Sequence, residues 1–257
     1  MHVLTILALA VVLVVVLAVV GVAALIAAAF RGRQPIADGM EINGLRIVKD
    51  RFVSLCLLPL AGGDVALFDA GIDKAGRAIL RELARRGLGP DSVKTIFLTH
   101  GHPDHMAGVR LFPKAQVMAL SEEVDVAEGR AYSGGRLFRA LPLRPTGVTV
   151  HRALHDGEVV DLGTAQVQVF AVPGHTVGSA AYLVNGVLVL GDAADAGSNG
   201  RVRGCPWVTS ESQPQDRASL RRLAARLASQ GGVEALVFAH SGCLRGMEPL
   251  TLAASEW

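Results

Sequence analysis

The sequence predicts an α/β fold of two β-sheets covered by helices, preceded by one transmembrane helix. Three features predict it: an uncharged apolar run near the amino terminus, strand-like and helix-like segments that alternate after it, and few strict strand–helix–strand repeats. We expect a membrane helix over residues 1–30, a linker over 31–39 and one folded domain over 40–257, which is long enough to bury a sizeable core.

The amino-terminal segment is apolar on all sides. Residues 3–30 carry no charge and include one hydroxyl side chain, Thr5, and one glycine, Gly21. As a helix the run would be about 42 Å long, more than the hydrocarbon core of a bilayer, about 30 Å. A cleaved signal peptide ending near residues 27–29 would have an apolar region of only about 7–15 residues, and a core helix is seldom apolar all round. A single-pass membrane anchor is therefore predicted.

Charge and cysteine content bear on the compartment. The basic residues near the apolar run all follow it: Arg31, Arg33, Arg46, Lys49 and Arg51. By the positive-inside rule the folded domain then lies in the cytoplasm. The three cysteines (Cys56, Cys205 and Cys243) are widely spaced and form no disulfide framework, which agrees with a reducing compartment. The extracytoplasmic side, or secretion after signal cleavage, stays open as an alternative.

The first half of the folded domain is predicted to contain strands and one helix. Apolar runs bounded by Asp, Gly and Pro predict strands at residues 45–48, 52–58, 65–68 and 93–99. Asp73 predicts the cap of a helix that runs to Arg86, and Gly87 is a typical stop for it.

The second half alternates in the same way. Strands are predicted at residues 116–119, 148–150, 167–172, 180–184, 187–190 and 234–239. Asn185-Gly186 is a typical two-residue hairpin turn. A helix is expected to open at Ser212 or Gln213 and to end before Gly231, and a last helix covers about residues 248–254.

The densest group of metal-binding side chains follows the strand predicted at residues 93–99. The run His100-Gly101-His102-Pro103-Asp104-His105 holds three of the eight histidines and a carboxylate. Imidazole nitrogens and carboxylate oxygens are ligands for zinc and related metals, and α/β sheets place their sites at strand ends. A solvated turn is the alternative, but the crowding of these side chains favours a hydrolytic metal centre.

Three further loops repeat this pattern of an apolar strand followed by a possible ligand. His175 follows the strand predicted at residues 167–172, Asp192 follows 187–190, and His240 follows 234–239. Alone, Asp192 could cap a turn and His240 could support another group through a hydrogen bond. Together the four loops predict one shared cleft.

In order and spacing, these four loops resemble the motifs of the metallo-β-lactamase fold superfamily. The likeness covers residues from about 40 to the carboxyl terminus, and Asp69-Ala70-Gly71 resembles the family's early Asp-x-Gly turn. The resemblance implies that residues 40–257 form a metallo-β-lactamase-like hydrolase domain, a four-layer αβ/βα sandwich with metals at one edge of the two sheets.

The resemblance also implies two divalent metal ions, with zinc favoured and iron or manganese as alternatives. The first ion would be held by His100, His102 and His175. The second would be held by Asp104, His105 and His240, with Asp192 bridging the pair. A hydroxide shared by the two ions would be the nucleophile, and Asp104, as the catalytic residue, would orient it and accept its proton.

These residues do not select a substrate. Family members include β-lactamases, thioesterases of the glyoxalase II type, lactonases, phosphodiesterases and iron-dependent persulfide dioxygenases, which share the fold and the metals. Ser179 stands where glyoxalase II-like proteins have the last histidine of Gly-His-Thr-x-Gly-His, which argues against a thioesterase. The predicted function is a metal-dependent hydrolase of an ester, thioester, lactone, amide or phosphodiester bond.

Two other functions stay open at this point: a mononuclear iron oxygenase for thiols or persulfides, and a non-catalytic membrane scaffold stabilised by metal. No ligand position is missing from the sequence, which favours an enzyme over a scaffold. The predicted partners are a small-molecule substrate and, through the amino-terminal helix, a membrane. A net charge of +2 is too small to indicate nucleic acid.

Overall fold

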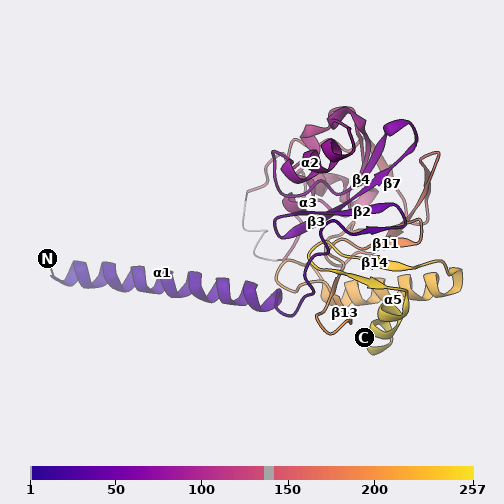
Figure 1. The fold of residues 1–257 in the computed structure, drawn as a ribbon. Coiled ribbons are helices and arrows are strands. Elements are labelled where there is room, and N and C mark those ends of the chain that lie inside the picture. Colours follow the sequence, from indigo (N-terminus) through magenta and orange to yellow (C-terminus); the bar gives the residue numbers. More distant parts are fainter. Residues whose placement is uncertain (1, 136–141) are drawn as a thin grey trace. The chain divides into compact units, whose positions relative to one another are not determined.

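The chain divides into two compact units, Met1–Gly32 and Arg33–Trp257. The structure, a computed structural model, describes residues 2–135 and 142–257 (Figure 1). The first unit consists mainly of one helix, α1 (His2–Ala29). The second unit contains both large β-sheets and the remaining helices.

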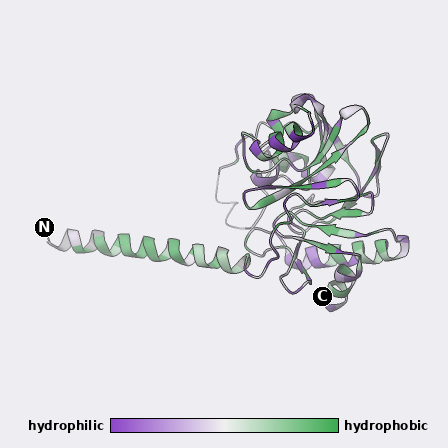
Figure 2. Cartoon of the chain, in the orientation of Figure 1, coloured by the Kyte–Doolittle hydropathy of each residue, from purple (hydrophilic) through white to green (hydrophobic). Residues whose placement is uncertain are grey.

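The amino-terminal segment forms one helix, as expected. α1 is hydrophobic along most of its length (Figure 2), and its described side chains, at residues 5–6, 9–25 and 27–28, are exposed. A membrane crossing needs about 20 consecutive apolar residues, and over the described residues alone no helix reaches the length and hydropathy of a membrane span. The predicted single-pass membrane localisation with a cytoplasmic domain is corrected on this finding, together with the predicted anchor and the membrane as a partner.

The first sheet has seven strands in chain order, antiparallel from β1 to β4 and parallel from β4 to β7. Its strands are β1 (Glu41–Ile42), β2 (Leu45–Asp50), β3 (Val53–Pro59), β4 (Val65–Phe68), β5 (Val93–Phe97), β6 (Gln116–Leu120) and β7 (Arg152–Leu154). Parallel neighbours need a crossover, and the three crossovers contain α2 (Arg77–Arg85), α3 (Pro103–Met106) and α4 (Val124–Ala127).

The second sheet has six strands in the order β15-β14-β11-β10-β9-β8. They are β8 (Val159–Asp161), β9 (Gln166–Ala171), β10 (Ala180–Val184), β11 (Val187–Val189), β14 (Ala235–Val237) and β15 (Cys243–Arg245). A small sheet pairs β12 (Ala194–Ala196) with β13 (Val202–Gly204), and the helices here are α5 (Gln213–Gln230) and α6 (Glu248–Glu256). Asn185 and Gly186 both have positive φ, 48° and 75°, so the predicted hairpin turn is confirmed.

Alternating side chains of the two sheets fill three apolar layers. In β3, Leu57 packs in one cluster with Ile79 of α2, whereas its neighbour Cys56 packs toward the second sheet. In β9, Val169 packs toward the first sheet and Phe170 packs in the cluster that contains α5 and α6. The order of layers is therefore helix, sheet, sheet, helix, and the predicted four-layer sandwich is confirmed.

Local contacts move some predicted boundaries. Asp73 accepts hydrogen bonds from the backbone N–H groups of Ala75 and Arg77, so it closes a turn and α2 begins only at Arg77. The strand predicted at residues 148–150 lies further along, at β7, where it pairs with β6. The strands β1, β8, β12, β13 and β15 were not predicted, because each has only two or three residues and lies in no longer apolar run.

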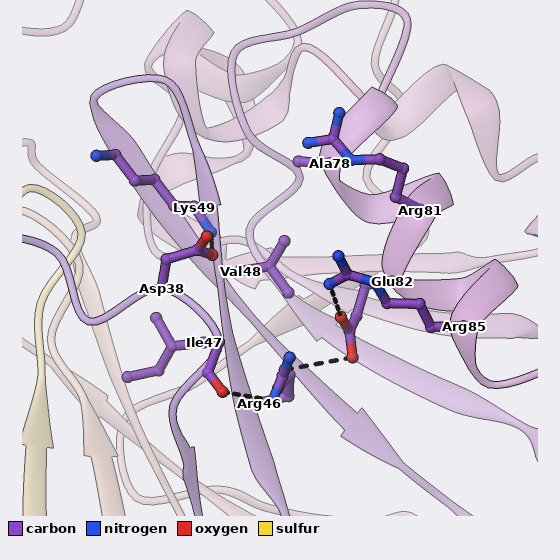
Figure 3. Close-up of a pocket in the computed structure, with 10 residues that line it drawn as sticks. Asp38, Arg46, Ile47, Val48, Lys49, Ala78, Arg81, Glu82 and Arg85 are labelled. Atoms are coloured by element: carbon purple, nitrogen blue, oxygen red, sulfur yellow. Dashed lines mark hydrogen bonds and ion pairs between the residues drawn. The ribbon is translucent and has the colours of Figure 1, made fainter.

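An ion-pair network ties α2 to the first sheet. Glu82 of α2 is buried and pairs with Arg46 of β2 at 3.3 Å, with Arg85 at 3.4 Å and with Arg86 at 3.2 Å. Figure 3 shows Glu82, Arg46 and Arg85 in the lining of a polar pocket between β2 and α2. The residues that line this pocket include none of the predicted metal ligands.

Candidate metal centre

The structure brings all seven predicted ligands into one cluster. They lie in α3 and in the loops after β5, β9, β11 and β14: His100, His102, Asp104, His105, His175, Asp192 and His240. Three sets have ligand atoms within 4.8 Å of one another: His100, His102 and His175; His100, His105 and Asp192; Asp104, His105 and His240. Because the sets share His100 and His105, they form one continuous site.

In the first set, three imidazole nitrogens converge on one point. His175 Nε2 lies 3.2 Å from His100 Nε2 and 3.0 Å from His102 Nδ1. Nitrogens that share one tetrahedral zinc ion at about 2.0–2.1 Å lie about 3.3 Å apart. The spacing of these three rings therefore suits a single metal ion, and we call them the three-histidine half of the site.

Hydrogen bonds on the outer side of two of these rings set their tautomers. Ser210 Oγ donates to a backbone carbonyl at 2.6 Å, so it accepts from His175 Nδ1 at 2.8 Å. Thr99 Oγ1 donates to the Asp69 carboxylate at 2.8 Å and therefore accepts from His100 Nδ1 at 3.1 Å. Both rings turn an unprotonated Nε2 toward the cluster, which is the form that binds a metal.

The other half of the site pairs imidazoles with carboxylates. Asp104 Oδ2 lies 3.8 Å from His105 Nε2 and 3.4 Å from His240 Nε2. On their outer sides, His105 Nδ1 donates to Asp69 at 2.8 Å and His240 Nδ1 donates to the Phe52 carbonyl at 2.9 Å. Each Nε2 therefore faces a carboxylate, and a cation, either a proton or a metal ion, is needed between them. We call this the mixed half.

Asp192 lies between the two halves. Its Oδ2 is 3.5 Å from His175 Nε2 and 3.2 Å from His240 Nε2, and its Oδ1 is 3.4 Å from His105 Nε2. Gly191 precedes it with φ 54°, and a Cβ there would lie 2.6 Å from Thr99 Oγ1. Glycine therefore lets this loop pass close enough to the end of β5 for the carboxylate to reach both halves.

The three-histidine half is electrically neutral. Burial lowers the pKa of His100 well below its ordinary value, the pKa of His102 to about 4 and the pKa of His175 to about 3. Neutral imidazoles are the form in which histidine binds a metal.

The mixed half has the opposite balance. Burial lowers the pKa of His105 and His240, but Asp192 and neighbouring carboxylates outweigh it, raising the pKa of His105 well above its ordinary value and that of His240 to about 10. Burial raises the pKa of Asp104, but His105 and a hydrogen bond with His240 outweigh it and hold that pKa at about 2. This half therefore attracts a cation.

Two buried atoms show that the residues fit a metal. Among the described residues, His105 Nε2 and Asp192 Oδ1 are buried, and they face each other at 3.4 Å without the geometry of a hydrogen bond. A buried polar atom without a hydrogen bond costs up to about 1–3 kcal/mol, and an ion coordinated between these two atoms would satisfy both. The donor set of imidazoles and carboxylates is also one that zinc accepts.

Several supporting residues were not recognised from the sequence. Asp69 was noted only as part of a turn, yet it supports His105 directly and His100 through Thr99. Ser210 lies 35 positions from the histidine it orients, and no local pattern marks it. Glu123 is a buried carboxylate that likewise had no sequence signal.

A four-layer sandwich with a cluster of histidines and aspartates at its strand ends is the architecture of a protein with a metal centre at the edge of two sheets. The family model described as the metallo-beta-lactamase superfamily matches residues 50–240. The chain belongs to that superfamily.

Several curated relatives carry the name of a hydrolase. A protein named hydroxyacylglutathione hydrolase from Acidiphilium cryptum is 36% identical over 188 residues, covering 73% of this chain and 64% of the relative. Another of that name, from Serratia proteamaculans, is 30% identical over 163 residues, covering 63% of this chain and 55% of the relative. The chain thus spans less than two thirds of the length of these relatives.

Solved structures agree with the fold. A metallo-beta-lactamase family protein from Thermus thermophilus has a TM-score of 0.59 and 26% identity, covering 84% of this chain and 78% of that one. A subclass B3 metallo-beta-lactamase of Bradyrhizobium japonicum has a TM-score of 0.62 and 18% identity, covering 89% of this chain and 93% of that one. At 18% identity the second likeness shows the fold alone.

Proposed function

We propose that this protein is a metal-dependent hydrolase whose seven clustered residues hold two divalent ions. His100, His102 and His175 would hold the first ion, Asp104, His105 and His240 would hold the second, and Asp192 would bridge them. The observation that carries the proposal is the support of four rings: His100, His105, His175 and His240 each use Nδ1 in an outer hydrogen bond and turn Nε2 inward.

The bound ions and the side chains of the protein would contribute different parts of the reaction. Two divalent ions in such a site supply a hydroxide nucleophile at neutral pH and polarise the scissile carbonyl or phosphoryl oxygen. The part of the chain is to fix the ligands and to move a proton. Asp104 is the candidate for proton transfer, because its side chain is 23% exposed and is held ionised beside His105 and His240.

Zinc is the proposed metal at both positions. Five imidazoles supply nitrogen donors and two carboxylates supply oxygen donors, a combination that suits zinc. Iron or manganese could occupy the same residues. Metal analysis of the purified protein decides among them.

Thioesters are the proposed first substrate class. The relatives described above are named hydroxyacylglutathione hydrolases, which outweighs the argument from Ser179. Ser179 Oγ accepts the N–H of Thr176 at 3.0 Å and lies 2.7 Å from the Thr176 hydroxyl. It therefore stabilises the loop after His175, a task that does not require histidine.

The proposal is tested by metal content and hydrolysis measured together. The full chain should retain two metal ions and hydrolyse members of a panel of thioesters, lactones, β-lactams and phosphodiesters. Asp104→Asn should lower kcat by a factor of about 10² or more, since a positioned proton acceptor contributes about 10²–10⁴. The control is Asp161→Asn, an exposed carboxylate at the end of β8. Fewer than two ions in the wild type, or equal rates in the two variants, would overturn the proposal.

A further inference from the structure

We propose that two buried carboxylates outside the ligand set, Glu123 and Asp195, each hold one half of the metal site in place. Glu123 joins the loops of the three-histidine half, and Asp195 joins the loops that carry Asp192 and His240. This inference rests on the two-metal site proposed above and assigns the groups that position its two halves separately.

Glu123 connects two ligand loops through three hydrogen bonds. Its Oε1 accepts the backbone N–H of Gly101 at 2.8 Å, and its Oε2 accepts the N–H of Gly178 at 2.8 Å and the hydroxyl of Thr176 at 2.9 Å. Gly101 lies between two predicted ligands and Thr176 directly follows a third. A single carboxylate, 0% exposed, therefore sets the distance between the two loops.

Both loops also lie directly against the segment that carries Glu123. A Cβ on Gly178 would come within 2.4 Å of the backbone nitrogen of Glu123, and a Cβ on Gly101 within 2.8 Å of the backbone nitrogen of Ala127. No side chain fits at either position without moving the backbone. The carboxylate and the two glycines thus form one rigid junction, which we call the Glu123 junction.

Asp195 makes the corresponding connection in the mixed half. Its Oδ2 pairs with Arg33 at 2.5 Å, and its Oδ1 accepts the hydroxyl of Ser241 at 3.0 Å. Ser241 Oγ in turn accepts the backbone N–H of Ala196 at 2.8 Å. Asp195 and Ser241 are buried and the side chain of Arg33 is only 7% exposed, so water competes little for these bonds.

These contacts lock two ligand-bearing segments together. Asp195 lies three positions after Asp192 in the chain, and Ser241 directly follows His240. Asp192 Oδ2 and His240 Nε2 lie 3.2 Å apart, so the bond between Asp195 and Ser241 is beside the contact it supports.

The segment that provides Arg33 is itself fixed by the backbone. The N–H of Gln34 donates to the carbonyl of Ala196 at 2.8 Å, and the N–H of Gly242 donates to the carbonyl of Gln34 at 3.2 Å. Residues 33 and 34, which the sequence assigned to a linker, are therefore part of the support of the mixed half.

Burying these two carboxylates costs folding free energy, so stability does not explain their presence. Burial raises the pKa of Glu123 to about 7 and that of Asp195 to about 6, which reflects the cost of removing a carboxylate from water. Apolar side chains of similar volume often give equal or greater stability. What a carboxylate adds is directional acceptors for several donors at once, which is the property needed to position ligand loops.

The two halves can be separated experimentally in the full chain. His240→Ala leaves the three-histidine half, and His102→Ala leaves the mixed half. Into each background Glu123→Gln and Asp195→Asn are introduced, and zinc affinity is measured by competition with a chromophoric chelator. Each amide keeps the size of the side chain but places an N–H₂ group where an acceptor is needed.

We expect a crossed pattern. Glu123→Gln should weaken zinc binding about 10–100-fold in His240→Ala and leave it unchanged in His102→Ala, since loss of a supporting group typically costs that factor. Asp195→Asn should weaken zinc binding by a similar factor in His102→Ala and by clearly less in His240→Ala, where it acts only through the bridging Asp192. If either variant fails to fold, Thr176→Val and Ser241→Ala must show the same pattern with a smaller loss. Each removes the bond from its hydroxyl to the carboxylate, together with that hydroxyl's contact to Ser179 or to the Ala196 N–H.

Two results have different meanings. Equal losses in both backgrounds, or no loss in either, would overturn the separate positioning roles while leaving the two-metal site intact. Wild-type protein that binds fewer than two zinc ions would instead overturn the proposed function on which the inference rests.

Discussion

Asp69→Asn tests whether the fold holds its imidazoles in the metal-binding tautomer. Asp69 is buried and accepts three hydrogen bonds of 2.8 Å, from the N–H and the hydroxyl of Thr99 and from His105 Nδ1. Asparagine can keep the oxygen that accepts the Thr99 N–H. In place of the second oxygen it presents an N–H₂ donor to the other two groups.

The expected consequence reaches one ring in each half of the site. The Thr99 hydroxyl would accept from the new amide and donate to His100 Nδ1, and His105 Nδ1 would become an acceptor. Both rings would then carry their proton on Nε2, the nitrogen that faces the cluster. A protonated Nε2 cannot bind a metal.

The magnitude follows from the number of rings affected. Loss of a group that orients a metal-bound histidine typically costs about 10–100-fold in affinity, which is about 1.4–2.7 kcal/mol since tenfold corresponds to about 1.4 kcal/mol. Because His100 and His105 belong to different halves, we expect both ions to be weakened by about this amount.

The assay is zinc content per chain after dialysis against a series of chelator concentrations, with ¹⁵N NMR of the imidazoles to report the tautomer. Asp64→Asn is the matched control, because that carboxylate is 46% exposed and makes a loose ion pair with Lys94, at 3.8 Å. Unchanged zinc retention in Asp69→Asn, with both rings still protonated at Nδ1, would refute the reasoning.

Three further predictions concern stability. Gly101→Ala should lower the free energy of unfolding by about 1–3 kcal/mol, because its Cβ would lie 2.8 Å from the backbone nitrogen of Ala127; Gly89→Ala, with open space around it, is the control in urea unfolding. Tyr182→Phe should cost about 1 kcal/mol in the same assay, since the buried hydroxyl donates to a backbone carbonyl at 2.7 Å, and an unchanged midpoint would contradict this. Burial raises the pKa of Asp216 from 3.8 to about 7, so the folded state binds this proton more tightly and the stability it contributes is lost as the pH rises from 3.8 toward 7. Asp216→Asn should flatten that pH dependence, and an unaltered slope would count against the assignment.

Much of the site could be predicted from the sequence because it depends on local order. The run from His100 to His105 sits where a strand ends and a short helix starts, and both features are visible in neighbouring residues. Asn185-Gly186 similarly specifies its turn through positive φ at two adjacent positions. Neither pattern depends on contacts between distant segments.

The amino-terminal segment shows the limit of such local patterns. Its helix was predicted from composition and is present as α1, but the membrane span inferred from the same composition is not found among the described residues. Helix formation depends on the residues of the helix itself, so it could be predicted from them. Whether a helix crosses a membrane is not determined by its backbone conformation.

By itself the sequence determined which residues could be ligands and that they lie at strand ends. Only the tertiary structure decided which atoms of those ligands face the cluster, because the tautomers depend on Asp69 and Ser210, which are 36 and 35 positions from the rings they contact. It likewise decided the junctions at Glu123 and Asp195, where charged groups far apart in the chain meet in a dry interior. Hydrogen bonds between distant residues leave no periodic trace in a sequence, and they exist only once the sheets have packed.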